Sequence, residues 1–358
     1  MRTRTIILVV ALLLILGSAT SVLAQVDTAA ALTYLESQQN ADGGFGSGFS
    51  PDSTISSTAD TVLAIVAAGA DPATFDQDEN TPITYLAANA PSAGSGGDLA
   101  KLILAVIAVG ENPRDFGGVD SVAKLESLIG AGGKIGSETD TFVSHTLAVL
   151  ALASAERSIP DSVVEVIKAA QQEAGGWAWD GSAATAADTN TTAFAVQAII
   201  AAGESSTSDA VTLALAYYSG IQNEDGGWPY QNPSDFGTAT DANSTAVTIQ
   251  AIIAAGQDPA SADWTTGEGN TPVAALAALQ NESGAFAWQA AIPDDNLLAT
   301  VQALPAVAGK AFPLATMDVG AAAPAAMPET GGAAVNLALP LLLGGLALAG
   351  GGYVLRRK

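Results

Sequence analysis

The chain has 358 residues, of which 49% are hydrophobic, so it is long enough to build one large domain with a substantial core. It contains no cysteine, which excludes disulfides, thiolate zinc sites and a cysteine nucleophile. The formal net charge of −24 at pH 7 argues against nucleic acid as a partner.

Residues 1–24 have the organisation of a secretory signal peptide. Arg2 and Arg4 precede an apolar run, and the run ends in Val22, Leu23 and Ala24. Charge, hydrophobic core and small exit residue follow one another in this order in such signals. We predict cleavage after Ala24 and an extracellular body.

Residues 25–313 consist of six related units, each marked by a glycine pair or a variant of one. The six clusters are "QQNADGGFG", "GSGGD", "GAGGKIG", "QQEAGGWAW", "IQNEDGGWPY" and "LQNESGAFAW". A more amphipathic segment precedes each cluster, and we predict outer helices over 27–39, 81–89, 120–129, 161–172, 207–222 and 271–280. Thr81-Pro82 and Thr271-Pro272 are typical helix starts, with a capping residue before a first-turn proline.

An alanine-rich, strongly apolar segment follows each cluster. Segments such as "TDANSTAVTIQAIIAAG" are apolar nearly all round, which predicts buried helices that begin at Asp, Thr or Asn caps. Four of them end at a glycine, Gly69, Gly110, Gly203 or Gly256. Six buried helices in a ring, each backed by an amphipathic one, need only short connections. The expected fold class is therefore all-α, a closed (α/α)6 toroid of twelve alternating outer and inner helices.

The glycine clusters and the "DxNxTAxAxQA" helices resemble the prenyltransferase and squalene-cyclase repeat. This family includes terpene cyclases, protein prenyltransferase β subunits and transcobalamin-like carriers, and the resemblance covers residues 25–313. Transcobalamin-like carriers hold a corrinoid at similar positions, which makes cobalamin a possible ligand of Asp140, Asp188, Asn190, Asp241 and Asn243. After Pro313, however, there is no room for the small β domain that closes over cobalamin in those carriers.

The repeated clusters themselves are predicted to be structural. Gly226 and Gly227 permit a sharp reversal between an outer and an inner helix, because glycine tolerates positive φ at low cost. The glutamine of the cluster is expected to hydrogen-bond exposed amides at a helix end, with Trp228 covering Gln222. The same role is expected for Gln39, Gln172 and Gln280.

The predicted toroid brings one acid from each unit to a common mouth: Asp60, Asp98, Asp140, Asp188, Asp241 and Asp295. Capping of the inner helices is their simplest role. Asn190, Asn243 and Asn296 add polar groups beyond that need. One ring of each pair Trp177/Trp179, Trp228/Tyr230 and Phe286/Trp288 is left either for ligand stacking or for core packing. The hypothesised ligand-binding residues are Asp60, Asp140, Asp188, Asn190, Asp241, Asn243, Trp179, Tyr230 and Trp288.

No catalytic or metal-binding set emerges from the sequence. The acid cluster DxDD of class II terpene cyclases is absent, and the nearest string, at 76–79, follows an inner helix and so lies at the other end of the barrel. The Asp, Cys and His zinc set of protein prenyltransferases is also absent, and the single His145 is expected to be structural. Calcium is a weak possibility, because the acidic loops lack the twelve-residue calcium-loop spacing. No cofactor is required.

The C-terminal part is predicted to attach the protein to the cell. Residues 314–334 form an Ala/Pro/Gly linker, and residues 335–358 form an apolar transmembrane helix with a basic tail. The linker contains Met327, Pro328, Glu329, Thr330 and Gly331, which resemble the LPxTG sorting signal of surface proteins with Met in place of Leu. Sortase is thus a possible partner, and a permanent membrane anchor is the alternative.

Three function classes remain open. A cell-surface protein that binds a small molecule or a partner without turnover fits the anchor and the absence of catalytic clusters, and is the one we expect. An isoprenoid- or glycan-processing enzyme predicts a deep pocket with a carboxylate of raised pKa. An architectural spacer predicts a lumen filled by side chains.

Overall fold

A computed structural model describes residues 26–48, 50–137, 140–235 and 237–320. The predicted signal peptide, the MPETG motif and the predicted transmembrane helix lie outside these ranges. Within them, no helix is long and apolar enough to cross a membrane.

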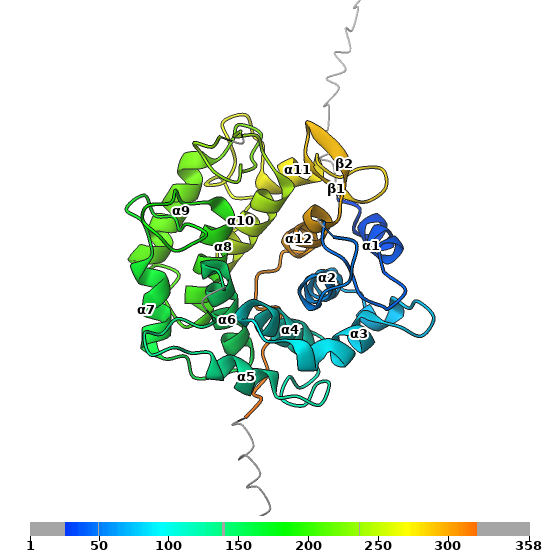
Figure 1. Cartoon of the computed structure of the whole chain (residues 1–358). Helices are drawn as coiled ribbons and strands as arrows, with labels where there is room; N and C mark the ends of the chain where they lie inside the picture. The colour runs from blue at the N-terminus through cyan, green and yellow to red at the C-terminus, as the bar shows by residue number, and fades with distance from the viewer. Residues whose placement is uncertain (1–25, 49, 138–139, 236, 321–358) are drawn as a thin grey trace, which may run out of the picture. The chain divides into compact units, whose positions relative to one another are not determined.

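The described chain forms two concentric sets of helices (Figure 1). The inner helices are α2 (Ile55–Ala67), α4 (Gly96–Ala108), α6 (Phe142–Ser154), α8 (Thr189–Ala201), α10 (Ala242–Ala254) and α12 (Leu297–Val307). The outer helices are α1 (Thr28–Ser37), α3 (Pro82–Asn89), α5 (Ser121–Ser127), α7 (Asp161–Ala169), α9 (Asp209–Ile221) and α11 (Pro272–Ala277). Two short 3-10 turns, η1 (Pro72–Thr74) and η2 (Ala90–Ser92), and one antiparallel hairpin, β1 (Phe286–Gln289) with β2 (Ile292–Asn296), complete the described elements.

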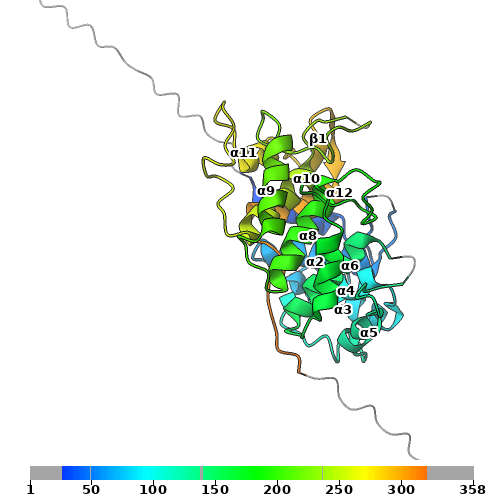
Figure 2. The ribbon, with the colours of Figure 1, turned by 90° about the vertical axis from the view of Figure 1, so that its left-hand side faces the viewer.

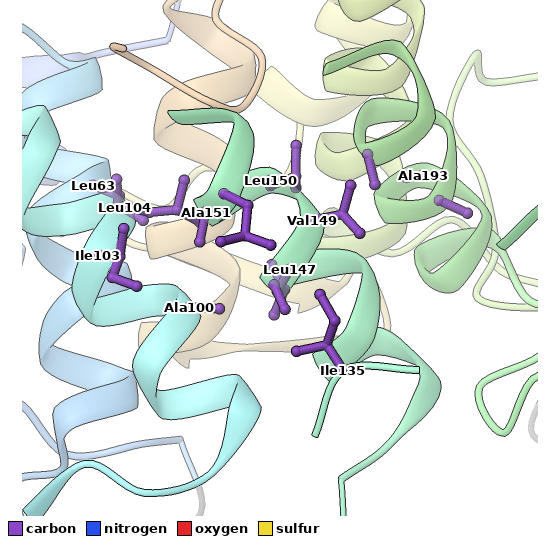
Figure 3. Packing of buried hydrophobic residues seen from close by; sticks show 14 of the residues in the cluster. Leu63, Ala100, Ile103, Leu104, Ile135, Leu147, Val149, Leu150, Ala151 and Ala193 are labelled. Carbon is purple, nitrogen blue, oxygen red and sulfur yellow. The ribbon is translucent and has the colours of Figure 1, made fainter. Parts of the chain in front are cut away.

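Each inner helix contacts the next one around the ring, and α12 returns to α2. The twelve-helix toroid is therefore confirmed for the part of the chain that the structure describes. Five inner helices, α2, α4, α6, α8 and α10, share one apolar cluster, and α12 packs in two smaller clusters with α2 and α10. Figure 3 shows Leu104, Leu147 and Leu150 of the large cluster. All three are nearly or fully buried. The near-continuous apolar character of these helices follows from their contact with neighbours on every side.

The repeated glutamine at the end of an outer helix links its own turn to the chain at the start of the next outer helix. Gln222 Nε2 donates to Gly226 O and to Trp264 O, both at 2.9 Å. Gln39 makes the equivalent pair of hydrogen bonds in the first unit. The acceptors are carbonyls, and not the helix-end amides that we expected, because the neutral side-chain NH2 is the group that faces the turn.

In the fourth unit the joint is made by Gln171 instead of the predicted Gln172. Gln171 Nε2 donates to Gly175 O and Ala210 O, both at 2.8 Å. Gln172 occupies the place that Asn223 has in its unit and donates to Thr185 O. Because Gln171 and Gln172 are adjacent in "QQEAGG", the sequence alone does not show which of them corresponds to Gln222.

The glycine after each joint is required by close approach as well as by its φ. Gly226 has φ +92°, and a Cβ there would lie 2.8 Å from the Thr271 carbonyl. At Gly284, with φ +88°, a Cβ would lie 2.2 Å from the Ala30 carbonyl carbon. Gln280 also donates to Asp27 O at 2.9 Å, so the last unit closes onto the first.

Residues 310–320 form a segment, here called the strap, that follows α12. In Figure 1 the strap runs in orange from α12 toward α5, and in the side view of Figure 2 it runs to the lower edge of the ring. It packs on the C-terminal ends of the inner helices, so the body includes residues 314–320, which the sequence had suggested as linker. Its hydrogen bonds are Phe312 N to Gln197 Oε1, Ser154 Oγ to Ala315 O, Met317 N to Ser154 O, Arg114 Nε to Val319 O and Arg157 to Gly320 O.

Candidate functional site

Two of the six predicted acids cap inner helices. Asp188 Oδ1 accepts from Thr191 N at the start of α8, and Asp241 Oδ1 accepts from Ser244 N at the start of α10, both at 2.7 Å. Each side chain is only 1% exposed. The capping role expected from the sequence is confirmed for these two residues.

The other four acids do not cap, and the caps are Thr54, Ser95, Thr141 and Asn296. Asp60 lies inside α2, Asp98 lies in the first turn of α4, Asp140 precedes the cap of α6, and Asp295 lies in β2. The prediction was wrong here because hydroxyl and amide side chains next to the acids cap as well as carboxylates do.

The charges of Asp60 and Asp140 are satisfied within the protein. Asp60 forms an ion pair with Lys101 at 2.6 Å. Asp140 accepts from Gly96 N at 3.1 Å, from Gly97 N at 3.3 Å and from Ser137 N at 2.8 Å. Burial alone would raise the pKa of Asp140, but these hydrogen bonds together hold it below its usual value.

A cavity of about 330 Å³, here called the mouth cavity, opens at the N-terminal ends of α8, α10 and α12. It brings together five of the nine predicted ligand-binding residues and adds three that the sequence analysis did not single out, Gly48, Leu298 and Gln302. Its lining is Gly48, Asn190, Tyr230, Asp241, Asn243, Trp288, Asn296, Leu298 and Gln302. Gln302 is four residues after Leu298, so helical periodicity on α12 could have indicated it.

The two aromatic rings of the mouth cavity are held by the backbone. Thr189 N donates to Tyr230 O at 2.8 Å, which fixes the loop against α8. Trp288 lies in β1, and the neighbouring Gln289 makes a β-bridge with Asp241. The preceding ring of each pair, Trp228 or Phe286, is fully buried, so one ring of each pair is left over as expected.

One polar atom of the lining residues has no partner within the described part of the chain. Asn190 Oδ1 is buried without a hydrogen bond. Asn243 Nδ2 donates to Gln302 Oε1 at 2.8 Å. Unused buried acceptors are uncommon in folded proteins and indicate a ligand or an ordered water.

Burial sets the electrostatics of the mouth cavity. It raises the pKa of both Asp188 and Asp241 to about 6, against the opposing effect of the capped backbone amides. Burial, followed by the charge of Asp188, raises the pKa of Tyr230 to about 12. Carboxylates of raised pKa beside a cavity are typical of functional sites.

The remaining predicted residues lie elsewhere. Trp179 is 52% exposed and lines a separate cavity of about 450 Å³ with Asp140 and Lys134. Asp60 lines a space of about 30 Å³ at the start of α2. Asp188 is buried at the start of α8 and lines none of these cavities, so the structure brings five of the nine predicted residues together and leaves four outside the mouth cavity.

His145 is structural, as expected. Its Nδ1 accepts from Ile135 N at 3.0 Å, and its Nε2 faces Val163 O at 3.1 Å. Burial lowers its pKa to about 4. His145 lies four residues after the cap of its helix and accepts from a backbone N–H of the preceding loop. Four other units have a threonine at this position with the same role; Thr192 Oγ1, for example, accepts from Trp177 N.

In the part of the chain that the structure describes, no group of three or more His, Asp or Glu side chains could hold a metal ion. The acidic string at 76–79 lies in the turn before α3, outside the mouth cavity.

Comparison with solved structures shows the same fold at low sequence identity. The type II terpene cyclase MstE from Scytonema is 12% identical, with a TM-score of 0.55 over 78% of this chain and 96% of that chain. A protein from Actinoplanes is 10% identical, with a TM-score of 0.55 over 79% of this chain and 97% of that chain. A glycosidase variant in complex with glucose is 12% identical, with a TM-score of 0.52 over 80% of this chain and 95% of that chain.

No curated protein matches the chain. The family model described as prenyltransferase alpha-alpha toroid domain matches residues 1–96 and 139–291, which is more than half of the chain. The chain therefore belongs to the prenyltransferase alpha-alpha toroid domain family.

Proposed function

We propose that the protein is an extracellular, surface-attached binding protein whose mouth cavity holds a small polar molecule without turnover. The observation that carries this proposal is one cavity whose lining combines two aromatic side chains with carboxylate and amide side chains. Asn190 Oδ1 is buried without a partner beside Asp241, Tyr230 and Trp288. A ligand that supplies hydrogen bonds and an apolar face would complete the site.

The size and surroundings of the cavity support a small ligand. About 330 Å³ is at the lower end of the range of about 300–1,000 Å³ for small-molecule pockets. Elsewhere in the ring, Leu104 of α4 and Leu147 and Leu150 of α6 pack in a buried apolar cluster (Figure 3). A long isoprenoid chain or a corrinoid would need more room, so cobalamin and isoprenoids are less favoured than a compact polar molecule.

The direction in which the chain leaves the toroid supports display at a surface. The strap lies at the C-terminal ends of the inner helices, where Ser154 closes α6, whereas the mouth cavity lies at the N-terminal ends. Gly320, the last described residue, therefore lies at the end of the toroid opposite the mouth cavity, and the predicted attachment segment follows it in the sequence.

Acid–base catalysis is a second candidate, and one observation favours it. The raised pKa of Asp188 and Asp241, about 6 in each case, is the feature that an enzyme of this fold would need. Product formation from isoprenoid alcohols and from aryl glycosides, lost in the Asp241→Asn variant, would establish this function in place of simple binding.

Isothermal titration of the full-length chain tests the proposal. The probes are glucose, ethanolamine, farnesol and cobalamin, with a polyoxyethylene detergent that has neither a sugar nor an ammonium headgroup. We expect glucose or ethanolamine to bind, and Asn243→Ala to weaken that binding about tenfold, because a hydrogen bond in a buried site contributes about 1–3 kcal/mol.

Ser56→Ala is the matched control, since Ser56 is the second residue of α2 as Asn243 is of α10, and it lies outside the mouth cavity. Binding of farnesol or cobalamin alone would favour the cyclase-like or carrier alternative. Binding of none of the four probes would overturn the proposal in favour of an architectural role.

A further inference from the structure

The mouth cavity carries negative charge that no side chain of the described protein neutralises. The ion pairs of the described residues engage Asp60, Asp120, Glu126, Glu165 and Glu204, and none engages Asp188 or Asp241. The lining includes neither lysine nor arginine. A buried carboxylate without a counter-charge is costly, and a cation bound in the cavity would offset that cost.

The two carboxylates act on the same aromatic ring. The charges of Asp188 and Asp241 both contribute to the raised pKa of Tyr230, after burial. Asp188 is 1% exposed, and its side chain also interacts with that of Tyr230. Tyr230 is 38% exposed and lines the mouth cavity, so it lies between the buried Asp188 and the cavity.

The unused atoms at this end of the toroid select for a donor. Asn190 Oδ1, which has no partner, and the Asp241 carboxylate are acceptors on lining residues, so a ligand must bring N–H or O–H groups. Tyr230 and Trp288 supply aromatic faces, which attract cations and most strongly so when the pair is removed from water. Acceptors, negative charge and aromatic faces together match an ammonium group.

Resting on the proposed binding function, we infer that the ligand of the mouth cavity is a small organic amine. Its ammonium group lies beside Asp241 and within the field of Asp188, and its carbon atoms contact Tyr230 and Trp288. The net charge of −24 would also steer a cation toward the toroid. A neutral sugar would satisfy the amides but leave both carboxylates uncompensated.

Paired probes of equal shape and different charge test this inference. Choline is compared with 3,3-dimethyl-1-butanol, and ethylamine at pH 7.5 with ethanol, by isothermal titration of the full-length chain in the same detergent with EDTA. We expect each cation to bind at least tenfold more tightly than its neutral counterpart. Asp241→Asn should weaken cation binding about tenfold and leave the neutral probes unchanged.

Asp60→Asn is the matched control, because Asp60 belongs to the same set of acids but is paired with Lys101. It should leave cation binding unchanged, which separates a local contact from the general field. Asparagine can replace aspartate as a cap, so α10 should persist in Asp241→Asn, as circular dichroism would show. Trp288→Leu, which touches no cap, should also weaken choline binding.

The outcomes separate this inference from the proposed function. Equal binding of cation and isostere, or equal losses in Asp60→Asn and Asp241→Asn, would overturn the ammonium assignment. Binding of glucose but of no amine would overturn the assignment and leave the binding function standing. Binding of no probe would overturn both.

Discussion

The two halves of the toroid mouth start from the same repeat and treat their acids in opposite ways. On the side of α2, α4 and α6, Asp60 is paired with Lys101, and Asp140 accepts backbone N–H groups from the start of α4. On the side of α8 and α10, Asp188 and Asp241 are buried without a counter-charge. The repeat thus supplies the scaffold, and single positions within it decide where a ligand can bind.

The sequence difference behind this contrast is small. Lys101 lies six residues after the cap of α4, whereas α8 and α10 carry Phe194 and Val247 at that position. Gly96 N and Gly97 N, at the start of α4, also donate hydrogen bonds to Asp140. On the side of α8 and α10, no ion pair of the described residues engages Asp188 or Asp241. Their negative charge therefore remains for a ligand.

A substitution at the contact between the last unit and the first should have the largest effect on stability, because both halves of the toroid depend on closure of the ring. Gly284→Ala places a Cβ about 2.2 Å from the Ala30 carbonyl carbon at positive φ, and we expect a loss of about 4 kcal/mol in unfolding free energy. Gly256→Ala has the same sign of φ with nothing within 4 Å and should lose about 1 kcal/mol. Urea unfolding measures both, and equal losses would contradict the closure joint.

Replacing Asp241, which has no counter-charge, should change stability at neutral pH in the opposite direction to replacing Asp140, whose charge is satisfied. The folded-state pKa of Asp241 is raised from 3.8 to about 6, so ionisation costs folding energy above pH 6 and that cost vanishes below pH 4. Asp241→Asn should therefore gain up to about 3 kcal/mol over the wild type at pH 7.5, and this gain should vanish near pH 4.

Asp140→Asn is the counterpart from the other half. Because the pKa of Asp140 is lowered, its ionised form stabilises the fold at neutral pH, and the variant should be less stable there. His145, with a pKa lowered to about 4, opposes Asp241 but is common to all three proteins and cancels in the differences. Urea unfolding from pH 4 to 7.5 tests this, and parallel curves for the two variants would contradict the contrast.

Replacing His145 should show that one repeat position serves both halves. His145→Ala leaves Ile135 N without its acceptor, and we expect a loss of about 2 kcal/mol. His145→Thr restores the acceptor used in the α8 unit by Thr192 and should recover about half of that loss. Thermal unfolding compares the two, and a threonine variant no better than alanine would refute the shared role.

Removing the counter-charge of the first half should have the smallest effect on stability. Lys101→Met leaves Asp60 without its ion pair, but both side chains are partly exposed, at 23% and 27%. We therefore expect a loss within about 1 kcal/mol. A loss of 3 kcal/mol or more in urea unfolding would mean that the ion pair is part of the scaffold.

The sequence predicted the scaffold because its signals are local and repeated. Apolar periodicity, Gly226 and the Thr81 and Thr271 caps follow from chemistry within a few residues, and the structure has them where expected. The acids were harder to place, because Thr54 or Ser95 caps as well as aspartate does. Asp60 is paired with Lys101, and Asp140 accepts from Gly96 N; in both cases the partner belongs to a neighbouring unit. The sequence of one unit therefore does not show which acids lack a partner.

The most direct measurement of the central claim is side-chain amide NMR of the 15N-labelled protein during titration with glucose, choline and ethylamine. The account predicts that the amide signals of Asn190 and Asn243 shift on saturation, whereas those of Asn40 and Asn223, which hold turns outside the mouth cavity, stay in place. Shifts confined to the Trp179 indole or to the turn amides, or no shift with any probe, would contradict a ligand site at the mouth cavity.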